Sequence, residues 1–306
     1  MIYDLIIIGG GSAGMSAGIY GKRYGLKTLI ISKEVGGSLN EAQIVENYPG
    51  IKSISGLELM FKFKEHVDSL GVEFIEDIVV KAEKKDDRFV VYTANKKYEA
   101  RALILALGLQ RRRLNVLGEE KFVGKGVSYC YTCDAPLFKD KIVAVVGGSD
   151  SATTAALLIS KYAKKTYIIH RGDKLRAAPI NVKAVEQDKN IEVIYNTNVI
   201  ELRGNGFLKE AILDKPYKGK KEFKIDGLFV EIGLVPSTAI AESLGIMLDE
   251  SNFIVVDNYK RTNVKGVFAA GDITNTVLRQ NITAAADGAI AAKSAYEYIK
   301  EKELNN

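Results

Sequence analysis

Residues 4–34 read DLIIIGGGSAGMSAGIYGKRYGLKTLIISKE and predict a strand, a tight turn, a helix and a second strand. Leu5–Ile8 form a short apolar run, which is typical of a parallel strand buried on both faces. Gly9, Gly11 and Gly14 follow with the spacing G-x-G-x-x-G. In this pattern the first glycine permits the turn, the second admits a pyrophosphate and the third lets helix and strand pack closely. The stretch therefore predicts a dinucleotide-binding unit of an α/β protein.

The second strand of this unit, predicted at Thr28–Ile31, ends just before Glu34. A carboxylate about 20 residues beyond the last glycine can bind a ribose hydroxyl. Free N–H groups at the start of the intervening helix would face the phosphates. A lone G-x-G-x-x-G also occurs in glycine-rich turns of unrelated α/β proteins, so the flanking strands and Glu34 carry the prediction.

Residues 141–176, KIVAVVGGSDSATTAALLISKYAKKTYIIHRGDKLR, repeat the pattern. Ile142–Val146 are the predicted strand, and Gly147, Ser149 and Ala152 hold the positions of G-x-G-x-x-A. Ser149 replaces the middle glycine, which makes the approach of a pyrophosphate sterically tighter. This second unit also predicts a dinucleotide.

Basic residues stand in the second unit where the first has Glu34. The strand predicted at Thr166–Ile169 is followed by His170, Arg171 and Arg176. Arginines accommodate a 2′-phosphate that a carboxylate would repel, and a guanidinium can bind phosphate through two hydrogen bonds. The loop therefore favours NADP(H) over NAD(H), with a solvated basic loop as the alternative. If the second unit holds NADPH, the first most simply holds FAD.

The segment SYCYTCDAPLF, residues 128–138, contains Cys130 and Cys133, the only cysteines of the 306-residue chain. A C-x-x-C pair outside a disulfide framework is typical of a redox or metal site. A structural zinc needs four ligands, and the only histidines are His66 and His170. The pair is therefore predicted to be redox-active. Asp134 is a candidate for moving protons to and from the thiolates, or for capping a helix.

The remaining composition points to an ordinary soluble enzyme. The net charge is +5, without a dense Lys/Arg block of the kind that binds nucleic acid. No apolar run reaches the 18 or more residues of a transmembrane helix, and the N-terminus does not resemble a signal peptide. We therefore expect a cytoplasmic protein without a metal. Residues 81–108 predict an antiparallel sheet.

These motifs together resemble the low-molecular-weight thioredoxin reductases, class II of the pyridine nucleotide-disulphide oxidoreductase family, over nearly the whole chain. Besides the cysteine segment, the resemblance rests on GGGSAG, EVGGSLNEAQIVENYPG, IHRGDKLR and GVFAAGDITNTVLRQNITAAADG. It implies an α/β fold of two Rossmann-like domains, the second inserted in the first. The FAD domain would comprise 1–114 and 241–306, and the NAD(P)H domain, with the C-x-x-C, 115–240. The family is typically homodimeric and rotates one domain against the other.

The motifs and the resemblance assign three sets of site residues. The catalytic residues are Cys130, Cys133 and Asp134. The FAD-binding residues are Gly9, Gly11, Ser12, Ala13, Gly14, Glu34, Gly36, Gly37, Ser38, Asn47, Val80, Gly108, Gly271, Asp272, Arg279 and Gln280. The NADPH-binding residues are Gly147, Gly148, Ser149, Asp150, Ser151, His170, Arg171 and Arg176. Gly172 departs from the pattern, because it replaces one arginine of the family's H-R-R-x-x-x-R segment.

The implied activity is that of a thioredoxin-disulfide reductase. Electrons would pass from NADPH through FAD and the Cys130/Cys133 dithiol to thioredoxin or a glutaredoxin-like protein. Three alternatives remain open: a dithiol oxidase of the same fold that uses oxygen, a reductase of this family with a donor other than NADPH, and a non-enzymatic redox sensor.

Overall fold

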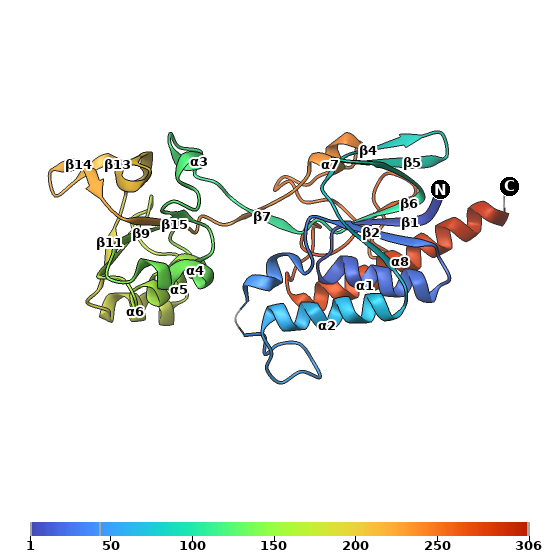
Figure 1. Ribbon diagram of the computed structural model, residues 1–306, viewed down its shortest axis with the longest axis horizontal. Helices are drawn as coiled ribbons and strands as arrows, with labels where there is room; N and C mark the ends of the chain where they lie inside the picture. Colours follow the sequence, from blue (N-terminus) through green and yellow to red (C-terminus); the bar gives the residue numbers. More distant parts are fainter. Residues whose placement is uncertain (1, 43, 305–306) are drawn as a thin grey trace. The chain divides into compact units, whose positions relative to one another are not determined.

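The computed structural model describes residues 2–42 and 44–304 and divides into two compact units (Figure 1). Unit 1 comprises Met1–Gln110 and Pro236–Asn306, and unit 2 is Arg111–Val235. The sequence placed the two chain crossings at 114/115 and 240/241. Each unit contains a parallel sheet of the Rossmann type, so the predicted fold class is confirmed. Which cofactor each unit binds stays a prediction.

Unit 1 is built on one seven-stranded sheet with the order β3-β2-β1-β6-β5-β4, and β17 pairs with the end of β6. The strands β1, β2, β3 and β17 run parallel to their partners, whereas β4 and β5 form an antiparallel extension on β6. The strands are β1 (Ile2–Ile8), β2 (Thr28–Ser32), β3 (Glu73–Glu76), β4 (Val79–Lys85), β5 (Arg88–Thr93), β6 (Lys97–Leu105) and β17 (Val267–Ala269). The helices are α1 (Ser12–Arg23), η1 (Gly37–Glu41), α2 (Gly56–Ser69), α7 (Ala239–Ser243) and α8 (Asn281–Leu304).

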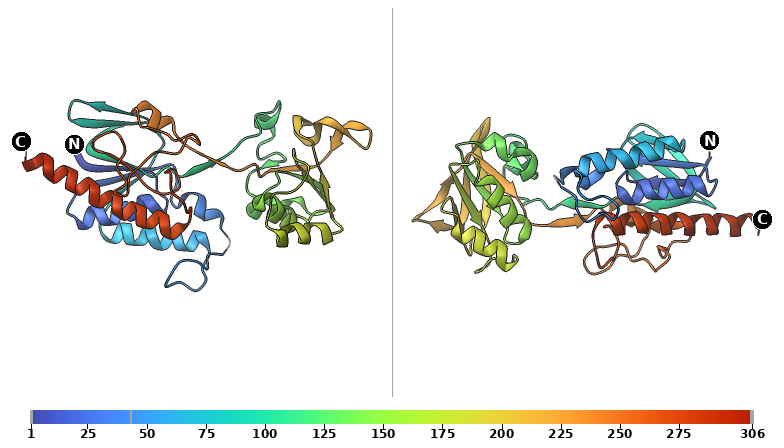
Figure 2. Two further views of the ribbon diagram at one scale, coloured as in Figure 1. Left: turned by 180° about the vertical axis from the view of Figure 1, so that it is seen from behind. Right: turned by 90° about the horizontal axis from the view of Figure 1, so that it is seen from below.

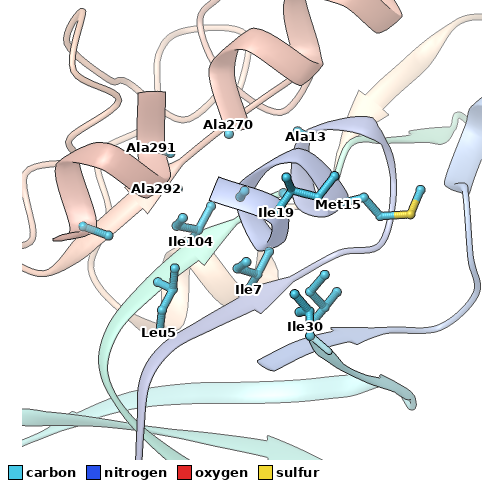
Figure 3. Close-up of a cluster of buried hydrophobic side chains, with 14 of the residues drawn as sticks. Leu5, Ile7, Ala13, Met15, Ile19, Ile30, Ile104, Ala270, Ala291 and Ala292 are labelled. Atoms are coloured by element: carbon cyan, nitrogen blue, oxygen red, sulfur yellow. The ribbon is translucent and has the colours of Figure 1, made fainter. Parts of the chain in front are cut away.

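The apolar run of β1 is buried on both faces, as expected for a central parallel strand. Leu5 and Ile7 pack into the cluster formed with α1 and α8 (Figure 3), while Ile6 and Ile8 pack into a second cluster on the other face. Helices α1 and α8 lie side by side and run in the same direction (Figure 2). Gly288 of α8 allows this contact, because a Cβ there would lie 2.0 Å from the Ala13 carbonyl oxygen.

Unit 2 contains a five-stranded parallel sheet with the order β11-β10-β9-β15-β8 and a three-stranded antiparallel sheet, β12-β13-β14. The strands are β8 (Val127–Ser128), β9 (Ile142–Val146), β10 (Lys165–Ile169), β11 (Ile191–Ile194), β12 (Val199–Asn205), β13 (Phe207–Tyr217), β14 (Lys220–Lys224) and β15 (Gly227–Val230). The helices are α3 (Glu119–Phe122), α4 (Tyr131–Asp134), η2 (Ala135–Phe138), α5 (Asp150–Ile159) and α6 (Pro179–Gln187). The strands at the chain crossings, β7 (Leu109–Arg111) and β16 (Leu234–Pro236), pair with each other. Among the described residues, no helix combines the length and apolarity that a bilayer-spanning segment needs.

Candidate active site

The turn between β1 and α1 is shaped by two glycines that touch neighbouring backbone. Gly9 has φ +118°, and a Cβ there would lie 2.1 Å from the Ala106 carbonyl oxygen. A Cβ on Gly14 would lie 1.8 Å from the Gly9 carbonyl oxygen. Any larger residue at either position would push the helix away from the sheet. These two glycines therefore serve the close packing of turn, helix and strand.

Gly11 has a different environment, because it faces open space. It is the N-cap of α1 and forms no side-chain capping bond, and the first turn contains no acidic residue. Among the described residues, a Cβ on Gly11 would meet only the Gly36 carbonyl oxygen, at 3.7 Å, and a Cβ on Gly37 would lie 3.8 Å from the Gly11 Cα. Bare backbone thus lines both sides of the helix N-terminus. This cradle, which a side chain would fill, fits the pyrophosphate of a dinucleotide.

Ser32, which the sequence analysis did not single out, ties the end of β2 to this turn. Its hydroxyl accepts a hydrogen bond from the Gly10 N–H (2.9 Å) and donates to the Glu34 carbonyl (2.7 Å). The Gly36 N–H donates to the Gly10 carbonyl at 2.8 Å. The carboxylate of Glu34 is exposed beside the cradle. In the sequence, the only sign of this role of Ser32 was its position as a small hydroxyl residue at the end of the second strand.

The C-terminal segment meets the first cradle at Gly271, where φ is +80° and a Cβ would lie 3.0 Å from the Ala13 Cβ. Burial raises the pKa of the neighbouring Asp272, and the Arg279 guanidinium opposes this shift. Arg279 donates to the carbonyl oxygens of Asp272 (3.3 Å) and Thr274 (3.2 Å). The structure therefore brings Asp272 and Arg279 to the start of α1.

The loop after β2 also reaches this segment, because the Asn47 amide donates to the Gln280 side chain at 2.9 Å. The hydroxyl of Ser12 is turned toward the Met60 sulfur at 3.6 Å. Ser38 and Val80 are exposed, and Gly108 has φ +60°. A flavin role for these last three residues stays a prediction.

The second cradle, in unit 2, repeats the architecture with tighter surroundings. A Cβ on Gly147 (φ +152°) would lie 2.2 Å from the Glu231 carbonyl oxygen. Ser149 is the N-cap of α5 without a side-chain capping bond, and its hydroxyl lies 3.2 Å from that of Ser151. The N-terminus of α5 can therefore face a phosphate, as that of α1 can.

The carboxylate of Asp150 is bound to a neighbouring helix rather than to a cofactor position. It accepts hydrogen bonds from the Ala178 N–H and the Asn181 amide, both at 2.8 Å. The Ala178 N–H is the main cause that lowers the pKa of Asp150. Asp150 thus holds the start of α6 against α5, and direct contact with a nucleotide stays a prediction.

His170 is buried between two glycines at the end of β10. Its ring lies 2.3 Å from where a Gly148 Cβ would be and 2.7 Å from a Gly172 Cβ. Its Nε2 is buried without a partner among the described residues, and burial, with help from Arg176, lowers the pKa of this imidazole. Arg171 and Arg176 are exposed. Neither forms an ion pair within the described ranges, so both can receive an anion.

The two cysteines form a disulfide, with their Cα atoms 5.4 Å apart. Cys130 precedes α4 and its sulfur accepts a hydrogen bond from the Cys133 N–H at 3.3 Å. The Ser128 hydroxyl accepts from the Cys130 N–H at 3.0 Å. Cys133 is exposed and Cys130 is half-buried. The pair predicted from its spacing is therefore joined and accessible from solvent, with Asp134 next in the chain.

A buried carboxylate fixes the residue before the disulfide. Glu119 is 2% exposed and accepts the N–H groups of Leu114 (2.8 Å) and Asn115 (2.7 Å). Tyr129 donates its hydroxyl to the same carboxylate, and burial raises the pKa of Tyr129. Sequence reasoning missed Glu119, because nothing in the spacing of its partners, which lie 4, 5 and 10 residues away, marks this carboxylate as buried.

Within residues 2–42 and 44–304, no cluster of three or more His, Cys, Asp or Glu side chains could hold a metal ion. Residues 3–289 match the family model described as "Pyridine nucleotide-disulphide oxidoreductase". The chain is 41% identical to the "Thioredoxin reductase" of Bacillus subtilis (strain 168), covering 98% of this chain and 96% of that protein. The chain belongs to the thioredoxin reductases of this family.

Solved structures agree with this assignment. A thioredoxin reductase of Lactococcus lactis in its "FR conformation" superposes with a TM-score of 0.86 at 36% identity, covering 98% of this chain and 99% of that one. The T. acidophilum thioredoxin reductase gives 0.82 at 37% identity, with 97% and 98% covered. A "Ferredoxin-Flavin Thioredoxin Reductase" from Clostridium acetobutylicum gives 0.57 at 33% identity, with both chains fully covered. The predicted family and enzyme class are confirmed, and the family implies FAD and NAD(P)H as cofactors.

Proposed function

We propose that the chain is an NADPH-dependent thioredoxin-disulfide reductase, with FAD in unit 1 and NADPH in unit 2. Its dithiol would reduce the disulfide of thioredoxin or a glutaredoxin-like protein. The observation that carries the proposal is the solvent-accessible Cys130–Cys133 disulfide in a chain with two dinucleotide cradles. When bound, FAD would accept a hydride from the nicotinamide and supply two electrons to this disulfide.

The residues of unit 1 fit FAD in three places. The backbone at Gly11 and the start of α1 would bind the pyrophosphate, and Glu34 would accept hydrogen bonds from a ribose. Asp272 and Gln280 would bind the remainder, with Arg279 holding the Asp272 carbonyl in place.

The residues of unit 2 would hold NADPH through α5 and the basic loop. The N-terminus of α5 at Ser149 would face the pyrophosphate. Arg171 and Arg176 would bind the 2′-phosphate, because both are exposed and unpaired among the described residues. Gly172 leaves two arginines where the family's pattern has three, so NADPH recognition depends on this pair.

The reduced pair would act by thiol–disulfide exchange. A thiolate attacks a sulfur of the partner disulfide and forms a mixed disulfide, which the second thiol then resolves. The Cys133 N–H, which points at the Cys130 sulfur, would stabilise a thiolate there. Asp134 would carry protons to and from the sulfurs.

The deciding experiment is an anaerobic titration of the purified yellow protein with NADPH and, separately, NADH. We expect NADPH to bleach the visible flavin band and then to drive reduction of a thioredoxin disulfide. Failure with both nucleotides, together with thioredoxin reduction by the dithionite-reduced protein, would assign another donor such as reduced ferredoxin. Failure of the reduced protein to act on thioredoxin would refute the reductase function itself.

The proposal extends to assembly and location. We expect a homodimer in the cytoplasm, where protein thiols are kept reduced. Light scattering should then give about twice the 33.5 kDa of one chain.

A further inference from the structure

An ion pair with little solvent exposure lies beside the C-terminal segment of unit 1. The Lys260 ammonium is 2.6 Å from one carboxylate oxygen of Asp287, and the two side chains are 14% and 10% exposed. Such pairs contribute little net stability, since desolvation offsets the attraction. Removing one partner is nonetheless costly, because the other charge is then left unpaired in the interior. The pair therefore calls for an explanation other than stability.

The second carboxylate oxygen of Asp287 suggests such an explanation. It accepts a hydrogen bond from the Gly271 N–H at 3.3 Å. Gly271 is the residue whose left-handed backbone lies against Ala13 at the start of α1. Asp287 thus joins the ion pair to the residue that brings Asp272 to the first cradle.

Lys260 is itself held in place on both sides. It has φ +62° in a turn where the Asp257 carboxylate accepts the N–H groups of Tyr259 and Arg261, each at 2.9 Å. The Lys260 carbonyl accepts the Ala269 N–H at 3.1 Å. Lys260 therefore contacts the segment that contains Ala269 and Gly271 in two ways. Its backbone carbonyl binds Ala269, and its ammonium acts on Gly271 through Asp287.

We propose that Lys260 and Asp287 are positioning residues for FAD, a role that rests on the proposed function. The Asp287 carboxylate fixes the Gly271 N–H, and with it the direction in which Asp272 leaves the segment. Lys260 holds that carboxylate in its orientation through the ion pair. Neither residue needs to touch the cofactor.

The test compares two neutral replacements of the pair. In Lys260→Met/Asp287→Asn, an amide oxygen can still accept the Gly271 N–H, whereas in Lys260→Met/Asp287→Leu it cannot. FAD dissociation constants are measured on the full chain from flavin released on dilution. Unfolding midpoints are measured on the same samples after the flavin has been removed. Lys293→Met, which breaks an exposed pair with Glu297 on the same helix, is the matched control.

We expect Lys260→Met alone to weaken FAD binding about 10- to 100-fold, as when residues that orient metal ligands are lost. The Asn double variant should restore binding, and the Leu double variant should remain about 5- to 100-fold weaker than the Asn variant, because the Gly271 N–H is left unsatisfied. The unsatisfied N–H also lowers the unfolding midpoint of the Leu double variant, so the deciding measurement is the FAD affinity of the folded protein, which a purely structural role would leave equal in the two double variants.

Equal FAD affinity in the two double variants would overturn the inference, as would wild-type affinity in Lys260→Met. If Lys260→Met fails to fold, the comparison of the two double variants still decides. A wild-type chain that binds no FAD would overturn the proposed function as well, so the two failures are distinguishable.

Discussion

Replacing Gly11 with valine should remove FAD from the protein while leaving unit 1 folded. The site of the new Cβ is open, since the nearest non-adjacent atom among the described residues, the Gly36 carbonyl oxygen, would lie 3.7 Å from it. The fold should therefore lose only the difference in N-cap preference, about 1 kcal/mol. The valine side chain would instead occupy the space between α1 and Gly37 that we assign to the pyrophosphate.

The loss of FAD affinity can be estimated from the hydrogen bonds to the phosphate that the valine would remove. Two backbone N–H groups bound to a phosphate are worth about 1.5–3 kcal/mol each. Their loss raises the dissociation constant by roughly 10² to 10⁴. Purified Gly11→Val should be colourless, and added FAD should restore little of the yellow colour.

Gly14→Ala is the contrasting change in the same helix. Its Cβ would lie 1.8 Å from the Gly9 carbonyl oxygen, so helix and turn must separate. Overpacking of this kind costs about 1–3 kcal/mol or more, against a gain of up to about 1 kcal/mol in helix propensity. We therefore expect a lower stability of the flavin-free fold for this variant.

The assay measures bound flavin by absorbance and fold stability by chemical unfolding of flavin-free protein. Tight FAD binding by a folded Gly11→Val would refute the placement of the pyrophosphate. Unchanged stability of Gly14→Ala would refute the packing role of the third glycine.

Three further predictions concern the electron path and its pH dependence. Cys130→Ser or Cys133→Ser should abolish thioredoxin reduction but leave flavin reduction by NADPH intact. A dithionite titration of either variant should then show two electrons per chain instead of about four. Full activity in both variants would contradict the dithiol role. Arg171→Ala or Arg176→Ala should raise the NADPH KM about 10- to 100-fold with little change for NADH in steady-state assays, and equal effects on both nucleotides would argue against a 2′-phosphate contact. Burial raises the pKa of Asp272, so ionisation of this carboxyl destabilises the flavin-free fold once the pH exceeds the pKa of the carboxyl in the unfolded chain, about 3.9. Asp272→Asn should therefore be more stable than wild type at pH 7. Unfolding measured as a function of pH should show this gain vanishing below about pH 4.

Local patterns in the sequence were sufficient for the strands that carry the cradles. Ile142–Val146 was predicted with the bounds that β9 has, because a buried parallel strand consists of apolar residues alone. β1 was predicted from Leu5 but begins at Ile2. The additional residues pair with Glu99 and Ala100 of β6, a partner far away in the sequence.

The segment 81–108 shows the limit of the same reasoning. β4 and β5 are antiparallel neighbours, as predicted. β6 has a second role that the prediction lacked, because it also pairs in parallel with β1 in the central sheet, between Glu99 and Leu105. At Glu99 and Ala100 the strand has an antiparallel neighbour, β5, on one edge and a parallel neighbour, β1, on the other, and no local spacing in the sequence predicts both.

In the basic loop of unit 2, the effect of Gly172 in place of an arginine of the family's pattern can be explained only with the structure. In the sequence, Gly172 is simply a missing arginine. In the structure, a side chain at 172 would begin 2.7 Å from the buried Nε2 of His170, whose ring also lies against Gly148. An arginine restored at 172 must therefore displace His170, and it would add a third cation only by disturbing the turn that opens the second cradle. Under the proposed function, recognition of a 2′-phosphate would then depend on Arg171 and Arg176 alone, so Gly172→Arg should not tighten NADPH binding unless His170 is also replaced by a smaller residue.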